Sequence, residues 1–146
     1  MVGDGSALDE IKSIVMKNEI PNVFFWGRVS LQEVQRYYKK SNALVISLLA
    51  LPAFESYIPS KFQTYLYHGK PILCAMRGPV AQIIREAQIG VIADPDNVND
   101  IASAFLKIST LTATQLNLIQ TTSNELLRKH FDRKKIINEI SEIVLK

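Results

Sequence analysis

The sequence predicts an α/β protein with a doubly wound parallel sheet, and two observations support this class. Short apolar runs alternate with helical segments along most of the chain, and the apolar runs lack the polar alternation of a half-exposed sheet. Strands that are linked through helices are parallel and cross over with a right hand. With 146 residues, 47% hydrophobic and 21% charged, we expect a single domain over residues 1–146 with one core.

Four apolar runs are expected to form strands, at residues 23–26, 43–46, 71–75 and 90–93. The run at 43–46 contains no polar residue, which favours a strand covered on both faces. The opening, residues 1–5, resembles the end of a strand that enters a turn. We therefore expect the chain to be part of a longer protein.

Helix starts are signalled by five residues, which are Ser6, Ser30, Pro59, Gly78 and Asn97. Ser30 forms a capping box with Glu33, and Ser6 is an expected N-cap. The helix that follows Pro59 should stop at Gly69, since glycine is favoured just beyond a helix C-terminus. From about residue 112 the chain is expected to be a helical tail, with a break near residues 131–132.

Composition excludes several functions. The net charge of +3 is small, and the one dense basic run, residues 128–135, suits a solvated helix face rather than a nucleic-acid site. One cysteine excludes an internal disulfide, and the two histidines lack metal-ligand spacing, so we expect neither a metal nor a cofactor. The start of the sequence shows no basic-then-apolar pattern of a secretion signal, and no apolar run reaches about 20 residues. We therefore expect a cytoplasmic location.

In sheets of this kind, ligands bind beyond the carboxyl ends of the strands. The segments expected there are residues 27–29, the loop 48–58, residues 76–78 and Asp94. Arg77 could reach this cleft or lie in a surface turn. The site is therefore predicted from topology before any family is considered.

The start of the helix after Pro59 is the strongest candidate binding feature. Free amide groups and the helix dipole at such a terminus attract anions. Lys61 adds a full positive charge in the first turn, where lysine is otherwise slightly unfavourable. A bound diphosphate would explain a lysine at this position. In the alternative interpretation, Ser60 is only an N-cap and Lys61 is only a solvated side chain.

Several motifs in order carry a resemblance to a known family. They are Val2-Gly3-Asp4-Gly5, the run Val23 to Val29, Pro59-Ser60-Lys61, Gly69-Lys70-Pro71-Ile72-Leu73, and Gly90. Their order and spacing over residues 2–110 resemble the C-terminal, donor-binding domain of retaining glycosyltransferases of family four. These enzymes have the GT-B fold, two Rossmann-like domains that face each other across a cleft. The resemblance thus implies a Rossmann-like parallel sheet with C-terminal helices.

The resemblance also implies roles for particular residues. Arg28 and Val29 would meet the nucleotide base. The loop residues implied to approach the donor sugar are Glu55, Ser56, Tyr57 and Ile58. Ser60 and Lys61 would bind the diphosphate, and Glu55 and Lys61 are the expected catalytic residues.

The family carries two glutamates eight positions apart, and this pair is not intact here. Counted back from Gly69, the ribose-binding position is Thr64, and the first position is Ser56 with Glu55 beside it. Thr64 could donate to a ribose hydroxyl. Gln63, eight residues after Glu55, is the alternative.

The implied function is donor binding in an enzyme that moves a sugar from a nucleoside-diphosphate sugar, expected to be UDP-linked. The acceptor would be a lipid-linked sugar or glycan, because the motifs resemble enzymes of bacterial O-antigen, lipopolysaccharide and capsule synthesis. Peripheral contact with the inner membrane face is then expected. Without the N-terminal acceptor domain the chain alone should be inactive. Two alternatives are a sugar-nucleotide epimerase half and a non-enzymatic flavodoxin-like module, for which Asp94 would be the phosphate-accepting residue.

Overall fold

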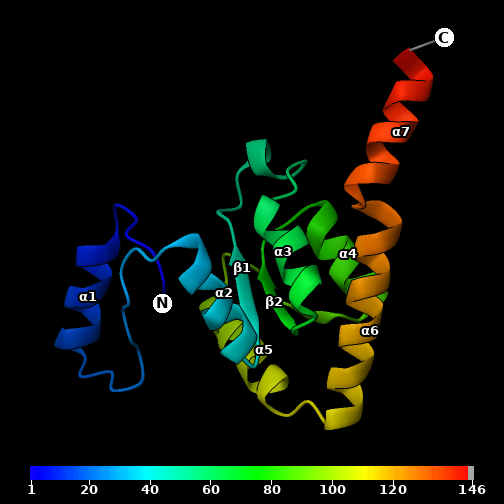
Figure 1. The fold of residues 1–146 in the computed structure, drawn as a ribbon. Helices are drawn as coiled ribbons and strands as arrows, with labels where there is room; N and C mark the ends of the chain where they lie inside the picture. The colour runs from blue at the N-terminus through cyan, green and yellow to red at the C-terminus, as the bar shows by residue number, and fades with distance from the viewer. Residues whose placement is uncertain (145–146) are drawn as a thin grey trace. The chain divides into compact units, whose positions relative to one another are not determined.

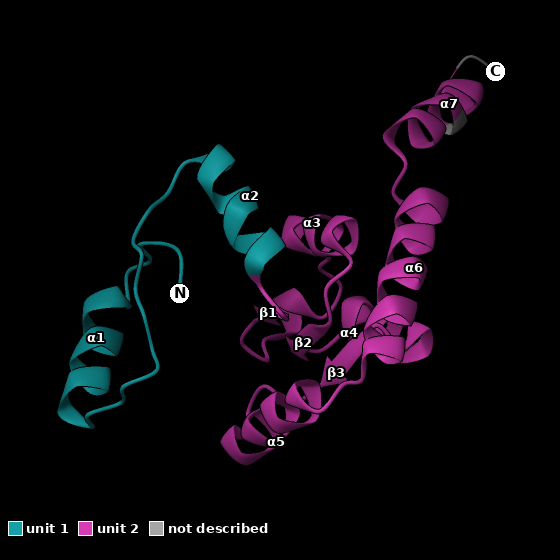
Figure 2. Cartoon of the chain, turned by 60° about the horizontal axis from the view of Figure 1, so that its bottom comes forward, with its two compact units in different colours: residues 1–40 teal, residues 41–146 magenta. Residues whose placement is uncertain are grey.

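The computed structural model describes residues 1–144, which fall into two compact units, residues 1–40 and residues 41 onward (Figure 2). The organisation as one domain stays a prediction from the sequence.

Unit 1 contains two helices, α1 (Leu8–Lys17) and α2 (Leu31–Lys40). The expected strand at 23–26 is wrong, since these residues form no regular strand. They are nevertheless extended and pair with the start of the chain: Trp26 N–H donates to the Met1 carbonyl (2.9 Å) and Gly3 N–H to the Gly27 carbonyl (2.7 Å). A ladder of so few hydrogen bonds is too short to count as a sheet.

The predicted capping box at the start of α2 is confirmed. Ser30 N–H donates to Glu33 Oε2 (2.9 Å), and Glu33 N–H donates to Ser30 Oγ (3.2 Å). The amide hydrogen bond from Ser30 lowers the pKa of the Glu33 carboxyl below 4.5, so the cap is weakened only as the pH falls through that lowered value. The expected cap at Ser6 is wrong. Helix α1 begins at Leu8, after Ala7, and no side chain caps it.

Unit 2 contains a parallel sheet of three strands, β1 (Leu44–Ser47), β2 (Ile72–Ala75) and β3 (Gly90–Ile92), in the order β1-β2-β3. Its helices, drawn in Figure 1, are η1 (Pro52–Phe54), α3 (Ser60–His68), α4 (Pro79–Ala87), α5 (Val98–Ser109), α6 (Ala113–His130) and α7 (Arg133–Val144). Parallel strands joined through helices confirm the predicted α/β class.

The core of unit 2 lies around β2, whose four residues are all buried. Phe62 and Leu66 of α3 and Ile84 of α4 are fully buried. Helix α4 packs against β2 and β3, and α3 packs against β1 and α6. In β1 only Leu44 and Ile46 are buried, whereas Val45 is 44% exposed. The expectation of burial on both faces of this strand is therefore wrong, because β1 lies at the edge of the hydrogen-bonded sheet.

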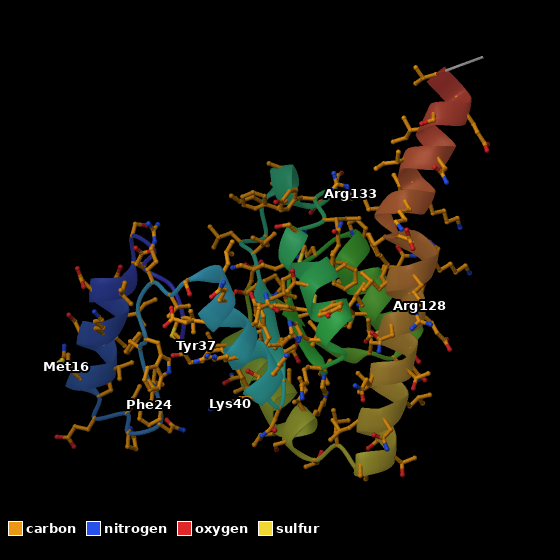
Figure 3. All side chains as sticks on the ribbon, viewed as in Figure 1. Met16, Phe24, Tyr37, Lys40, Arg128 and Arg133 are labelled. Carbon is orange, nitrogen blue, oxygen red and sulfur yellow. The ribbon has the colours of Figure 1, made fainter. Side chains whose placement is uncertain are left out.

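The end of α3 and the C-terminal helical tail both follow the sequence prediction. Gly69 has φ +59° and ends α3, and a Cβ on it would lie 2.7 Å from Gln120 Cγ of α6. The helical tail breaks after α6, where Asp132 Oδ1 accepts from the amides of Lys134 (2.8 Å) and Lys135 (3.2 Å) and so caps α7. Arg128 and Arg133, on either side of this break, are solvent-exposed as expected (Figure 3).

Cys74, in the middle of β2, is fully buried. Burial raises the pKa of its thiol from 9.0 to about 11. The thiol therefore favours the folded state fully below pH 9, and this contribution is lost as the pH rises through 11. We expect an aromatic disulfide reagent at pH 8 to leave Cys74 unmodified in the folded chain and to label it completely in denaturant. Rapid labelling without denaturant would contradict the buried position.

Ser123 of α6 is a fully buried residue whose Oγ has no hydrogen-bond partner in the described chain. A buried hydroxyl without a partner loses its hydration and gains nothing in return. Alanine also has the higher helix propensity. We expect Ser123→Ala to raise the free energy of unfolding by about 1 kcal/mol in a urea titration. A loss of stability would instead indicate that Oγ makes a contact absent from this structure.

Candidate functional site

The carboxyl ends of the three strands lead into three connections, residues 48–59, 76–78 and 93–97. The first is the longest and folds back through η1: Phe54 N–H donates to the Leu51 carbonyl (2.9 Å) and Tyr57 N–H to the Phe54 carbonyl (3.2 Å). It delivers the chain to the start of α3. The candidate site residues of unit 2 lie in this connection and in α3.

The first turn of α3 opens beside the carboxyl end of β1. A cavity of about 280 Å³ lies there, and its lining includes Ser47, Leu48, Tyr57, Pro59, Ser60 and Lys61. Ser60 and Lys61 are solvent-exposed, and among the side chains that the structure describes the Lys61 ammonium forms no ion pair. A cation is thus held at a helix N-terminus that faces open space.

Ser60 is the first residue of α3 rather than its cap, so the alternative that it serves as the N-cap is wrong. The N-cap is Pro59, in extended conformation, and its side chain caps no amide because proline has no side-chain acceptor. The Phe62 N–H already donates to the Pro59 carbonyl (2.9 Å). The amides of Ser60 and Lys61 are therefore the first-turn donors that an anion would use.

Glu55 and Ser56 line a different and larger depression than Lys61. It measures about 1150 Å³ and lies between the connections that follow β1, β2 and β3. Tyr57 turns instead to the cavity at α3, and Ile58 is 38% exposed between them. Thr64, one turn after Lys61, is partly exposed, and Gln63 is exposed. The structure thus places Glu55 and Ser56 at one cavity and Tyr57, Ser60 and Lys61 at another, whereas Ile58 and Thr64 line neither of the two.

Arg77, which the sequence left open between cleft and surface turn, lies in the wall of the larger depression. Its Nη2 atom lies 2.9 Å from Asp96 Oδ2 and 3.4 Å from Asp94 Oδ1. The Asp94 N–H donates in turn to Asp100 Oδ2 (2.7 Å). Sequence reasoning missed this cluster, although an arginine between a strand and a glycine, opposite an Asp-Pro-Asp turn, was its signal.

Arg28 and Val29 belong to unit 1, and their expected contact with a nucleotide base stays a prediction. Arg28 Nε forms an exposed ion pair with Asp4 Oδ2 at 3.2 Å. Arg28 and the Gly3-Asp4-Gly5 turn are therefore neighbours within unit 1.

Among the described residues, no cluster of three or more histidine, cysteine, aspartate or glutamate side chains is arranged to hold a metal ion. In the same part of the chain, every helix is too short or too polar to cross a membrane.

A parallel sheet with an uncapped helix N-terminus at its carboxyl edge is an arrangement found in proteins that bind phosphorylated ligands. The chain belongs to the glycosyl transferases group 1 family, whose model matches residues 1–125. It is also 24% identical over 115 residues to an uncharacterised glycosyltransferase of Methanocaldococcus jannaschii. That alignment covers 74% of this chain and 29% of the relative, so the chain spans less than a third of the relative's length.

The family match confirms the resemblance to a GT-B glycosyltransferase half. It argues against the flavodoxin-like module considered above. The Asp94 carboxylate, which that module would need, lies in the ion pair with Arg77.

Proposed function

We propose that this chain is the donor-binding part of a glycosyltransferase that uses a nucleoside-diphosphate sugar, with UDP as the nucleotide. The observation that carries the proposal is the open first turn of α3, where Ser60 and Lys61 line a cavity at the carboxyl edge of β1. Amide donors, the helix dipole and a lysine ammonium together match a diphosphate.

The same groups serve the chemical step. When the glycosidic bond to the donor breaks, negative charge grows on the leaving diphosphate. In this proposal, Lys61 and the amides of α3 would stabilise that charge without rearranging. Glu55 and Ser56, at the neighbouring depression, would contact the sugar, and Thr64 or Gln63 the ribose.

The acceptor is proposed to be a lipid-linked sugar or a glycan. The donor sugar would be transferred to it with retention, at the inner face of the cytoplasmic membrane. Support comes from the Pro59-Ser60-Lys61 and Gly69-Lys70-Pro71 motifs, which resemble those of bacterial O-antigen and capsule enzymes. Transfer needs donor and acceptor held together with water excluded. A second domain would supply the acceptor side, so this chain alone should not catalyse transfer.

Isothermal calorimetry of the folded chain tests the donor proposal. UDP should bind with release of heat, whereas uridine, which lacks the diphosphate, should bind far more weakly. Parallel titrations with ADP and GDP test the choice of base. A folded chain that binds none of the three diphosphates would overturn the proposed site, and a chain that prefers GDP would correct the nucleotide.

A further inference from the structure

The connection that carries Glu55 rests on the turn after β2 at a point where a side chain has no room. Gly78 has φ +92°, and a Cβ built on it would lie 2.2 Å from the Glu55 carbonyl oxygen and 2.9 Å from the Glu55 carbonyl carbon. Both neighbours are backbone atoms, which cannot rotate aside. Only glycine allows this approach, and only glycine adopts this conformation without strain.

The turn that supports Glu55 is itself fastened to the next connection. Arg77, the residue before Gly78, forms ion pairs with Asp94 and Asp96 in the turn after β3. Asp100, in the first turn of α5, holds the Asp94 amide. A continuous line of contacts therefore runs from α5 to the carbonyl of Glu55.

Packing beneath the connection is close. Met76, the residue before Arg77, is only 2% exposed. Together with Arg77 it lines a small gap beside residues 48–51, Phe54 and Glu55. The connection after β1 and the turn after β2 therefore lie next to each other, and their closest approach is at Gly78.

We propose that the Arg77-Gly78 turn is the positioning element that holds Glu55 and Ser56 at the edge of the larger depression. The inference rests on the proposed function for the meaning of that position, namely contact with the donor sugar. A methyl group at residue 78 has to push the Glu55 carbonyl away by about 1 Å to reach ordinary contact. A displacement of this size at a substrate-positioning group is enough to impair reaction geometry.

The structural half of the proposal is tested without any ligand. Amide hydrogen exchange of the full chain is followed by mass spectrometry for Gly78→Ala and for Gly69→Ala. Gly69→Ala is the control, because Gly69 also has positive φ and a Cβ on it would also collide, but with Gln120 of α6 (Cγ 2.7 Å, Cα 3.1 Å) rather than with residues 48–58. Gly78→Ala should speed exchange in residues 48–58 at least about threefold relative to β2, and Gly69→Ala should not. Arg77→Ala, which creates no collision, should give a smaller increase and serves if Gly78→Ala does not fold.

The ligand half uses two probes, UDP and UDP-glucose. Gly78→Ala should weaken UDP-glucose binding about tenfold and leave UDP within about twofold, because the diphosphate meets α3 rather than Glu55. Unchanged exchange in residues 48–58 in the folded Gly78 and Arg77 variants overturns the inference. Equal losses for both probes would also overturn it. Failure of the wild-type chain to bind either probe instead overturns the proposed function, and the exchange result then still decides whether the turn positions the loop.

Discussion

Replacing Lys61 with alanine is expected to weaken UDP binding about ten- to a hundredfold, the largest functional effect that we expect from a single side chain. The ammonium is exposed at the start of α3 and, within the described residues, forms no ion pair that would offset its attraction to an anion. A charge-assisted contact with a diphosphate contributes about 1.5–3 kcal/mol, which corresponds to this range. Calorimetry with UDP at low and moderate salt measures it.

Lys107→Ala is the matched control for this experiment. Lys107 is an exposed lysine in the last turn of α5, away from both cavities at the carboxyl edge. The Lys107→Ala variant should bind UDP with the affinity of the wild-type chain. In Lys61→Ala, by contrast, the stability of α3 should rise slightly, since a lysine is removed from a helix N-terminus. Equal affinities for wild type and Lys61→Ala would exclude the diphosphate role.

Gly90→Ala is expected to cause the largest loss of stability, about 3 kcal/mol or more in the free energy of unfolding. Gly90 begins β3, and a Cβ there would lie 2.0 Å from the Ile72 carbonyl oxygen and 2.9 Å from the Ile72 amide nitrogen. Both atoms belong to the backbone of β2. The methyl group can be accommodated only if the two strands separate, which breaks their hydrogen bonds.

A urea titration followed by far-ultraviolet circular dichroism measures this loss. Gly5→Ala is the control, because a Cβ on Gly5 meets nothing within 4 Å and its φ is not in the left-handed region. It should change the free energy of unfolding by less than about 0.5 kcal/mol. If Gly90→Ala unfolds at the same urea concentration as the control, the close approach of β2 and β3 is wrong.

Elements whose signals are local could be predicted from the sequence. The Ser30–Glu33 capping box, the end of α3 at Gly69 and the break after α6 each depend on residues within a few positions of one another. The α/β class followed from the alternation of apolar runs and helices. Such signals survive because tertiary contacts do not oppose them.

Features that depend on a partner elsewhere in the chain were predicted less well. Residues 23–26 have strand composition, but hydrogen bonding with residues 1–3 is too short to make them a strand. The exposure of Val45 depends on the place of β1 at the edge of the sheet. The run of apolar residues along the sequence does not indicate which strand lies at an edge.

The candidate site likewise has a part that local sequence signals predicted and a part that depends on contacts between distant residues. The helix start at Ser60 and Lys61 was found because its signal lies within one turn of sequence. The separation of Glu55 from Lys61 into adjacent cavities, and the support of Glu55 by Gly78, arise from a contact between residues 23 positions apart. No pattern along the chain encodes that contact.

The edge position of β1 has a consequence for handling the protein. Residues 43–51 carry no charge, and Val45, Leu49 and Leu51 are 44%, 72% and 47% exposed. An uncharged, β-prone segment with a single hydrogen-bonded neighbour is a template on which another molecule can add a strand. Aggregation of the purified chain should therefore rise steeply with concentration, and a lysine at position 45 should act as a gatekeeper against it.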